Sequence, residues 1–266
     1  MSWLQSILYG IVSGLTEFLP ISSSAHQQIL GKLYGVSTFD PVLDFFVHIG
    51  VLAALFIAYR STIESILGAR RTRSRRRSVN DMDQMFVKTG TVPLVLFAIL
   101  MTYVGNRDVS LLSIVALSIL NGLLLFLQGR ILQGNKTAGA MSAIDSGLTG
   151  ILRSMWVFPG LSGVAAATTY GILRGADRQK ALNWAFLLTV PVLLVKLLLD
   201  FIRIFTAFSS VSFLSYIGYL VAAGFAFLSG YLAITLMRFL AVKTGFSGFA
   251  YYSWGFALLS FFLYLI

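Results

Sequence analysis

Apolar residues form six long runs along this 266-residue chain, and shorter polar segments separate them. The runs cover residues 42–59, 85–104, 109–132, 181–202, 211–237 and 247–266. About 20 apolar residues in a helix cross a hydrocarbon layer of about 30 Å, so each run is long enough to span a membrane. The pattern therefore predicts an all-α polytopic membrane protein with six transmembrane helices.

Two further apolar segments, residues 2–37 and 146–173, are interrupted by glycine, proline and serine. The interruptions are Gly10, Gly14, Pro20 and a serine run in the first, and Gly147, Gly150, Pro159, Gly160, Ser162 and Gly163 in the second. Broken segments at corresponding places in two halves indicate an inverted repeat whose hairpins meet at a midplane site. We therefore predict two re-entrant helical hairpins in a single integral membrane domain, residues 1–266. Its predicted halves are 1–133 and 134–266.

Lys and Arg residues are distributed unevenly over the two faces that this topology defines. With the N-terminus outside, internal segments hold 15 of them and external segments hold 3, in agreement with the positive-inside rule. The run from Arg70 to Arg77 directly follows a span and is predicted to be a cytoplasmic loop near anionic headgroups. No aromatic residues interrupt this run, so the net charge of +10 indicates contact with membrane lipids and no nucleic-acid partner.

The composition supports a membrane protein and excludes cysteine chemistry. Hydrophobic residues make up 57% of the chain, charged residues make up 11%, and the mean hydropathy is +0.84. The chain has no cysteine, which excludes thiolate metal sites, thiol nucleophiles and disulfides. The N-terminal segment lacks the pattern of a cleaved signal peptide, so we expect the mature protein to retain it.

The stretch GIVSGLTEFLPISSSAH, residues 10–26, concentrates polar groups in an otherwise apolar region. Ionisable groups at membrane depth are energetically costly, so Glu17 and His26 are candidate site residues. Pro20 ends the first helix and leaves three hydroxyl groups in or beside the turn. They belong to Ser22, Ser23 and Ser24.

A helix that begins after this turn presents backbone N–H groups to an anion, which suits a phosphate. A serine hydroxyl can donate to phosphate oxygens, or attack phosphorus with Glu17 or His26 as the base. The alternative interpretation is structural: the serines cap a helix, while Glu17 and His26 form hydrogen bonds with the backbone.

Arg153 lies in an apolar part of the second hairpin, where a guanidinium requires an anionic partner. The sequence leaves open whether this partner is Glu17 or a phosphate. Ser162 is a weaker candidate, because hydroxyl groups commonly satisfy helix backbones in membranes. Asp44 and His48 are four residues apart on one face of the first complete span. We interpret them as a supporting structural pair that holds this span against the hairpin.

The motif TEFLPISSSAH closely resembles the first signature of the undecaprenyl-diphosphate phosphatase family, the bacitracin-resistance type of membrane phosphatase. Similar stretches follow in the family's order: LDFFVHIG at 43–50, PGLS at 159–162, RGADRQKALNWAFLLTVP at 174–191 and FAYYSWG at 249–255. The resemblance covers essentially the whole chain. It implies six spans and two re-entrant hairpins in a bacterial plasma membrane. It also implies hydrolysis of undecaprenyl diphosphate to undecaprenyl phosphate, which recycles the carrier lipid of cell-wall synthesis.

Carried over by position, the resemblance implies catalytic roles for three residues. Glu17 matches the second glutamate of a Glu-x-x-x-Glu pair, Ser23 matches a nucleophile or phosphate ligand, and His26 matches the signature histidine. The groups predicted to bind the substrate phosphate are Ser22, Ser24, Arg153 and Ser162. If a divalent ion such as Mg²⁺ or Ca²⁺ takes part, Glu17 is its expected ligand.

Four positions depart from the family's pattern. Ser13 stands in place of the first glutamate, and Gly163 in place of the arginine in Pro-Gly-x-Ser-Arg. In the family, glutamine is usual at the position of Arg153. An arginine often follows the tyrosine near the C-terminus, at the position where this chain has Ser253. Loss of an arginine at a phosphoryl-transfer site costs about 10³ or more in rate, unless Arg153 supplies the missing charge.

Two functions from different classes are consistent with these residues. In the first, favoured by the resemblance, the chain is a lipid diphosphate phosphatase with a rearranged centre. In the second, catalysis is lost, and the scaffold binds, flips or senses a polyprenyl phosphate. The expected partner is a polyprenyl phosphate or diphosphate lipid in both cases. Gly224 and Gly230 suit close helix packing within or between protomers, so a homodimer is a further expectation.

Overall fold

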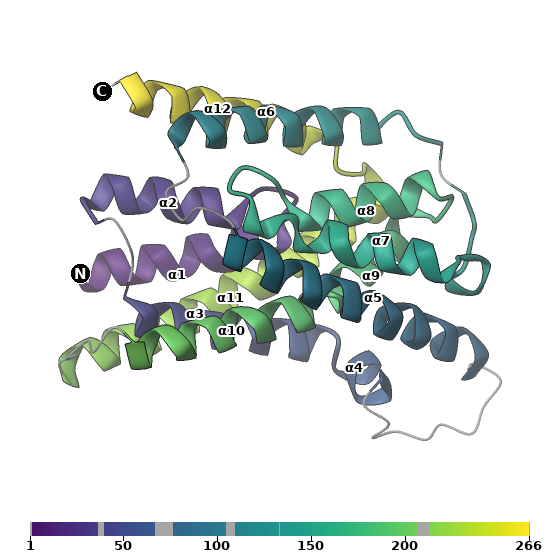
Figure 1. Ribbon diagram of the computed structural model, residues 1–266, viewed down its shortest axis with the longest axis horizontal. Coiled ribbons are helices and arrows are strands. Elements are labelled where there is room, and N and C mark those ends of the chain that lie inside the picture. Colours follow the sequence, from purple (N-terminus) through teal and green to yellow (C-terminus); the bar gives the residue numbers. More distant parts are fainter. Residues whose placement is uncertain are drawn as a thin grey trace.

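The computed structural model describes residues 2–36, 40–66, 77–104, 110–132, 134–206 and 213–265. Within these residues the chain forms helices and no strand (Figure 1). The α-helices are α1 Trp3–Phe18, α2 Ser23–Tyr34, α3 Pro41–Ala58, α4 Arg60–Ile66, α5 Arg77–Val104, α6 Leu111–Gln128, α7 Ala143–Arg153, α8 Gly163–Leu173, α9 Arg178–Leu187, α10 Thr189–Thr206, α11 Phe213–Lys243 and α12 Gly248–Leu265. Two 3₁₀ helices are η1 Ala138–Ala140 and η2 Ser154–Val157. The predicted all-α fold is confirmed.

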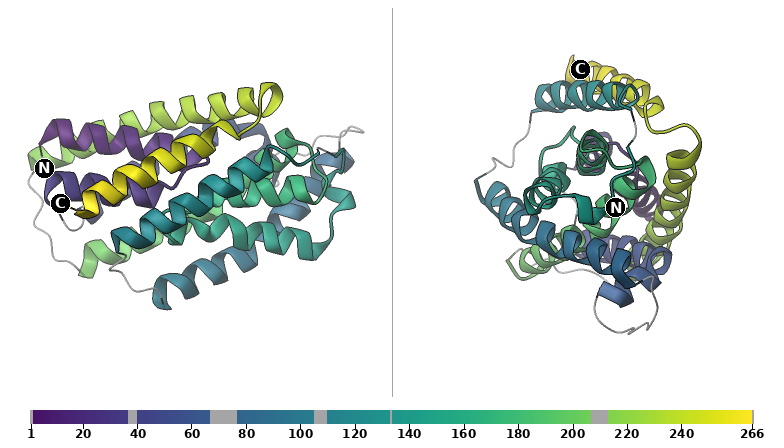
Figure 2. Two further views of the ribbon diagram at one scale, coloured as in Figure 1. Left: turned by 90° about the horizontal axis from the view of Figure 1, so that it is seen from above. Right: turned by 90° about the vertical axis from the view of Figure 1, so that its right-hand side faces the viewer.

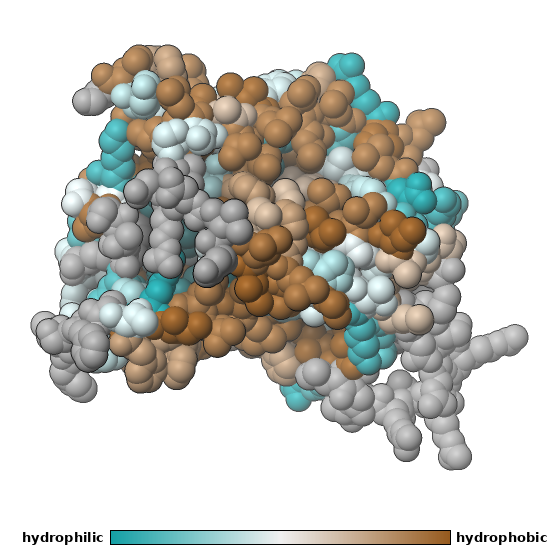
Figure 3. Space-filling model, viewed as in Figure 1, coloured by the Kyte–Doolittle hydropathy of each residue, from teal (hydrophilic) through white to brown (hydrophobic). Residues whose placement is uncertain are grey.

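Six helical segments in the described part of the chain are long and apolar enough to cross a membrane. They are Pro41–Ala58, Asp83–Thr102, Leu111–Gln128, Arg178–Thr206, Ser215–Lys243 and Gly248–Leu265, and they correspond one to one with the predicted spans. Hydrophobic side chains cover much of the middle of the molecule, and polar ones gather toward its two ends (Figure 3). The bundle therefore presents an apolar surface of the kind that faces lipid.

Each broken segment forms a helical hairpin. Residues 19–22 join α1 to α2, and residues 154–162, which include η2, join α7 to α8. The breaks coincide with Pro20 and Pro159, as expected for residues that cannot continue a helix. The hairpins extend from opposite ends of the bundle, and their turns meet in its middle (Figure 1).

The glycines in the first helix of each hairpin do not interrupt that helix, contrary to the prediction. Gly10 and Gly14 lie inside α1, and Gly147 and Gly150 lie inside α7. Close packing explains three of them. A Cβ at Gly10 would lie 2.3 Å from the carbonyl oxygen of Ala222 in α11. Gly14 and Gly150 contact backbone oxygens of α11 and α5 in the same way, so these glycines let helix backbones approach one another.

The two halves of the chain repeat one order of elements, a hairpin followed by three long helical segments. The segments are α3, α5 and α6 in the first half, and α9–α10, α11 and α12 in the second. Packing recurs between equivalent elements: α3 packs on α10, α6 on α12, α1 on α11, and α7 on α5. Long helices surround the hairpins (Figure 2). This exchange of partners is the arrangement expected of an inverted repeat.

Two predictions on the layout fall outside the described residues. The predicted boundary between the halves follows residue 133, which is one of the undescribed positions. Of the predicted loop from Arg70 to Arg77, only Arg77 is described, as the first residue of α5. Gly230 is described and packs within the protomer, because a Cβ there would lie 3.1 Å from Phe18, whereas Gly224 has open space around it.

The fourth predicted span is divided into α9 and α10 at Leu188. Pro191 lies in the first turn of α10, and a proline ring clashes with the carbonyl four residues earlier, at Leu187, where α9 ends. The break places Thr189 at the start of α10, fully buried. Its hydroxyl oxygen accepts hydrogen bonds from Arg153, at the place where the two hairpins meet.

An ion pair closes the base of the second hairpin. Arg174 Nε donates to Asp145 Oδ1 over 2.6 Å, and Tyr170 donates to the same oxygen over 2.9 Å. Asp145 also forms a capping box with Ser142 at the start of α7. The hydrogen bond to Asp145 raises the pKa of Arg174, so the guanidinium stays charged throughout the physiological range.

Candidate functional site

A buried ionic cluster lies where the two hairpins meet. Arg153 Nη2, at the end of α7, donates to Glu17 Oε1 over 3.2 Å. Lys196 Nζ, on α10, donates to Glu17 Oε2 over 2.5 Å. The exposed fractions are 5% for Glu17, 1% for Arg153 and 6% for Lys196. The structure thus brings together the predicted pair of Glu17 and Arg153, and adds a second cation.

The position of Arg153 is determined by contacts with α9 and α10. Its Nε and Nη2 donate to Thr189 Oγ1 over 3.1 and 2.9 Å, and Nε also donates to the Ala185 carbonyl over 3.3 Å. Arg153 is the last residue of α7, where a cation interacts favourably with the negative end of the helix dipole. These bonds fix the guanidinium beside Glu17.

Lys196 lies between Glu17 and an aromatic ring of the second hairpin. Its Nζ is 4.9 Å from the centroid of the Trp156 ring, a cation–π contact. Trp156 belongs to η2, in the turn between α7 and α8. The indole Nε1 of Trp156 is buried and has no hydrogen-bond partner among the described residues.

The three serines of the first hairpin point to three different partners. Ser23 Oγ donates to Glu17 Oε2 over 3.1 Å. Ser22 Oγ caps α2 by accepting from Ala25 N, and it also accepts from Gly160 N of the second hairpin over 2.9 Å. Ser24 Oγ donates to the Trp156 carbonyl over 3.0 Å. Only Ser23 therefore contacts the ionic cluster, while Ser22 and Ser24 join the two hairpin turns.

Asn121, in the middle of α6, connects both hairpins to α12. Its Nδ2 donates to the Pro20 carbonyl over 3.0 Å and to Ser253 Oγ over 3.1 Å. Its Oδ1 accepts from Ser162 N over 3.0 Å. The predicted phosphate ligand Ser162 uses its hydroxyl to cap α8, where it accepts from Ala165 N.

His26 is directed toward α12. Its Nδ1 lies 2.6 Å from the Ser22 carbonyl and must donate to it, so Nε2 accepts from the Tyr252 hydroxyl over 2.8 Å. The ring also stacks on Phe256 with a centroid separation of 4.0 Å. Tyr252 borders a pocket of about 360 Å³ at the turn between α11 and α12. Among the described residues, no hydrogen bond joins His26 to Glu17 or Ser23.

Asp44 and His48 share a helix face, as predicted, but each bonds to a different helix. Asp44 Oδ1 accepts from the Tyr9 hydroxyl of α1 over 2.5 Å, which holds this span against the hairpin. His48 Nδ1 donates to Asp200 Oδ2 of α10 over 2.6 Å. Arg203 lies 4.0 Å from Asp44 and 3.9 Å from Asp200. Together these groups extend the polar interior toward the N-terminal end of the bundle.

The residues around Glu17 do not fit a divalent metal ion. Mg²⁺ and Ca²⁺ prefer several oxygen ligands, commonly with more than one carboxylate. Both Glu17 oxygens accept hydrogen bonds from side-chain cations, and Ser13 accepts from Gln27 Nε2 over 3.1 Å. The described residues contain no group of three or more His, Cys, Asp and Glu side chains suited to a metal.

Sequence reasoning missed several buried polar residues of this region. Among them are Asn121, Lys196 and Asp200. They lie in apolar runs that were interpreted only as spans, Asn121 in one and both Lys196 and Asp200 in another. A lone charged or amide side chain at membrane depth is itself a signal of a site, and applied to every span this rule would have found them.

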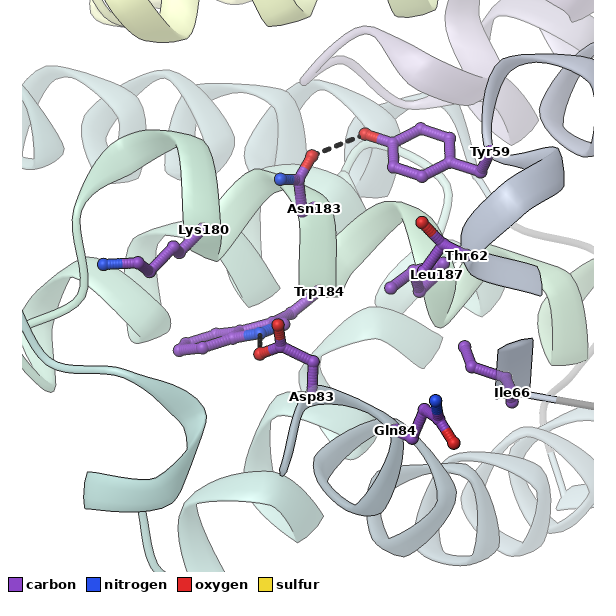
Figure 4. A pocket seen from close by; sticks show the side chains of 9 residues that line it. All are labelled: Tyr59, Thr62, Ile66, Asp83, Gln84, Lys180, Asn183, Trp184 and Leu187. Atoms are coloured by element: carbon purple, nitrogen blue, oxygen red, sulfur yellow. Dashed lines mark hydrogen bonds between the residues drawn. The ribbon is translucent and has the colours of Figure 1, made fainter. Parts of the chain in front are cut away.

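A separate pocket of about 200 Å³ lies between α3, α4, α5 and α9 (Figure 4). Inside it Tyr59 donates to Asn183 over 2.7 Å, and Trp184 donates to Asp83 over 2.9 Å. None of the predicted site residues lines this pocket. It is therefore distinct from the cluster at Glu17.

Comparison with known proteins gives one family. The family model described as "Bacitracin resistance protein BacA" matches residues 6–259. A protein of Prochlorococcus marinus named undecaprenyl-diphosphatase is 30% identical over 266 residues, with 97% of this chain and 98% of the relative covered. Proteins of the same name from Halothermothrix orenii and Idiomarina loihiensis are each 28% identical. Coverage of this chain and of the relative is 96% and 95% for the first, and 90% and 89% for the second.

Proposed function

Since this chain belongs to the bacitracin resistance protein BacA family, we propose that it is a membrane phosphatase for undecaprenyl diphosphate. The reaction consumes one water, cleaves the P–O–P bond, and yields undecaprenyl phosphate and inorganic phosphate. The apolar helices and the family indicate a multi-pass protein of the bacterial plasma membrane. The relatives' names support the hydrolase assignment.

One observation carries the proposal for the site: the buried contact of Ser23 with Glu17, which in turn binds Arg153. A hydroxyl within hydrogen-bond reach of a carboxylate is the arrangement of a nucleophile and its base. A guanidinium bound to the same carboxylate is close enough to neutralise charge on the phosphate oxygens. These three residues come from both hairpins, which explains why the turns must meet.

In the proposed mechanism, Ser23 Oγ attacks the terminal phosphorus while its proton passes to Glu17. The new Oγ–P bond forms as the bond from phosphorus to the bridging oxygen breaks, and undecaprenyl phosphate leaves. Water then attacks the phosphoserine and the Oγ–P bond breaks. Glu17 returns its proton to Oγ, which restores the hydroxyl and releases inorganic phosphate. Arg153 stabilises the negative charge on the equatorial oxygens in both steps.

The N-termini of α2 and α8 strengthen this assignment. Both helices begin at the central turns, with Ser22 and Ser162 as their N-cap residues. Each presents the positive end of a helix dipole at the place where the phosphate is proposed to bind. We assign His26 to positioning, since its hydrogen bonds hold the Ser22 turn and Tyr252.

The second function considered from the sequence, a binder or translocator without catalysis, has no support from the comparisons. This alternative was considered because Ser13 stands in place of a glutamate and Gly163 in place of an arginine. Arg153 supplies a guanidinium beside Glu17, so the loss at Gly163 does not require loss of activity.

The test is phosphate release from undecaprenyl diphosphate by the purified protein in detergent. We expect release by the wild type and a loss of about 10² or more in rate for Glu17→Gln, which keeps the size of the side chain. The matched control is Glu64→Gln, in an exposed ion pair with Arg60, and it should keep the wild-type rate. A wild type that binds the lipid but releases no phosphate would refute the proposed function.

A further inference from the structure

The cluster at Glu17 carries an excess of positive charge. Two cations, Arg153 and Lys196, bind a single carboxylate, and all three side chains are buried. Uncompensated charge is costly in a protein interior, so an excess cation there indicates the place of an anion. The cluster lacks one negative charge in the described structure.

Neighbouring carboxylates do not supply it, because other groups already bind them. Asp200 accepts from His48 over 2.6 Å and lies 3.9 Å from Arg203. Asp44 accepts from the Tyr9 hydroxyl and lies 4.0 Å from Arg203. Neither carboxylate forms an ion pair with Lys196 or Arg153 among the described residues.

Unused donors surround this excess charge. An ammonium has three N–H donors, and in the described structure Lys196 donates one, to Glu17. The indole N–H of Trp156, whose ring lies over the ammonium, has no acceptor among the described residues. A buried donor without an acceptor is energetically costly, and an entering oxyanion would recover that cost.

We propose that Lys196 and Trp156 bind the terminal phosphate of the lipid diphosphate, and that Lys196 and Arg153 make the site independent of a divalent metal ion. This inference rests on the proposed function and deepens it. The phosphate approaches the part-exposed Trp156 and accepts hydrogen bonds from its Nε1 and from Lys196 Nζ. Glu17 holds both cations in place and keeps them apart.

Fixed cations perform the electrostatic task that a metal ion performs in other phosphoryl-transfer sites. Charge that is already oriented neutralises the equatorial oxygens without reorganisation during the reaction. The same cations occupy both oxygens of Glu17, the carboxylate that a metal would need. Ser13, where the family pattern has a second carboxylate, cannot replace it.

The first experiment measures phosphate release from undecaprenyl diphosphate by the wild type in EDTA, and again with Mg²⁺ or Ca²⁺. We expect equal rates in all three conditions. Release that stops in EDTA and returns with the metal would overturn the inference and leave the proposed function intact. This arm needs no variant, so it holds even if a substitution impairs folding.

The second experiment measures binding of farnesyl diphosphate, a detergent-soluble polyprenyl diphosphate, by calorimetry in EDTA. Lys196→Met should weaken binding about tenfold or more, and Trp156→Phe, which keeps a ring but removes the N–H, should weaken it by less. Lys196→Arg should restore most of the affinity. The control Lys243→Met changes an exposed residue at the end of α11 and should bind as the wild type does.

The two experiments together separate the two claims. If the wild type releases no phosphate but binds the diphosphate in EDTA, and Lys196→Met weakens this binding, the phosphatase is refuted but the anion site is supported. Unchanged affinity in both Lys196→Met and Trp156→Phe, with normal release by the wild type, refutes the anion site but supports the phosphatase. Thermal unfolding of each variant establishes that the folded protein is being compared.

Discussion

Gly163 lies directly against the guanidinium of Arg153. A Cβ on Gly163 would be 2.9 Å from Arg153 Nη1 and 2.1 Å from the Arg153 carbonyl oxygen. In the signature that this sequence resembles, an arginine is expected at the position of Gly163 and a glutamine at the position of Arg153. The guanidinium therefore reaches the same region from the other side of the hairpin turn, and in this chain a side chain at position 163 would collide with Arg153.

Restoring an arginine at Gly163 should destabilise the protein. Even Gly163→Ala forces a shift of the backbone at Arg153, and overpacking of this kind costs about 1–3 kcal/mol. The measurement is the thermal unfolding midpoint in detergent. The control is Gly224→Ala, in an exposed part of α11 with open space around it, which should be neutral or stabilising. A Gly163→Arg variant as stable as the wild type would contradict the close contact.

Arg153→Gln, which introduces the residue usual in the family, should lower the rate of phosphate release by about 10²–10³. The reason is that Gly163 cannot supply the lost charge. Arg153→Lys keeps the charge but loses the forked hydrogen bonds to Thr189 and Glu17. Its rate of phosphate release should therefore lie between those of the wild type and Arg153→Gln. Steady-state kinetics should show the loss mainly in kcat. The control is Arg130→Gln, an exposed residue after α6, and a fall in its rate would point to a general effect of charge.

Ser23 and Ser24 should respond differently to substitution by alanine. Ser23→Ala removes the proposed nucleophile and should abolish release with little change in the unfolding midpoint. Ser24→Ala removes the bond to the Trp156 carbonyl and should lower stability by about 1 kcal/mol while keeping much of the activity. Parallel rate and unfolding measurements distinguish the two residues. Release by Ser23→Ala at the wild-type rate would leave Ser23 no more than a phosphate ligand.

Asn121→Ala should lower the free energy of unfolding several times more than the loss of a single hydrogen bond does. It removes three hydrogen bonds that join both hairpin turns to α12, and it leaves their buried partners unsatisfied. Ser118→Ala is the matched control on the same helix, because the buried Ser118 hydroxyl has no partner among the described residues. In thermal unfolding in detergent, Asn121→Ala should have a clearly lower midpoint than Ser118→Ala. Similar midpoints for both would show that Asn121 does not connect the turns.

The sequence was sufficient to predict the spans and hairpins, because apolar run length and breaking residues are local properties. It also predicted that Arg153 needs an anion, and Glu17 is its partner in the structure. It was wrong about Gly10 and Gly150, which look like breaks but are contact points. A glycine that bends a helix and one that admits a neighbouring helix have the same local pattern, and only the fold distinguishes them.

The composition of the site was harder to predict than the fold. Lys196 lies 179 residues from Glu17 in the chain, and no local spacing relates the two. His26 is only nine positions from Glu17, yet the first turn of α2 directs its ring to Tyr252. Distance along the sequence was therefore a poor guide to contact, because residues from both hairpins and from α10 complete one cluster.

Because the residues of the cluster lie far apart in the sequence, they are synthesised at different times. Glu17 leaves the ribosome 136 residues before Arg153 and 179 residues before Lys196. Until both cations have been synthesised, the carboxylate lacks one or both of its partners, so the ionic cluster cannot form. Completion of the centre must therefore await insertion of α10, and a chain truncated before that helix should be a substrate for membrane quality control.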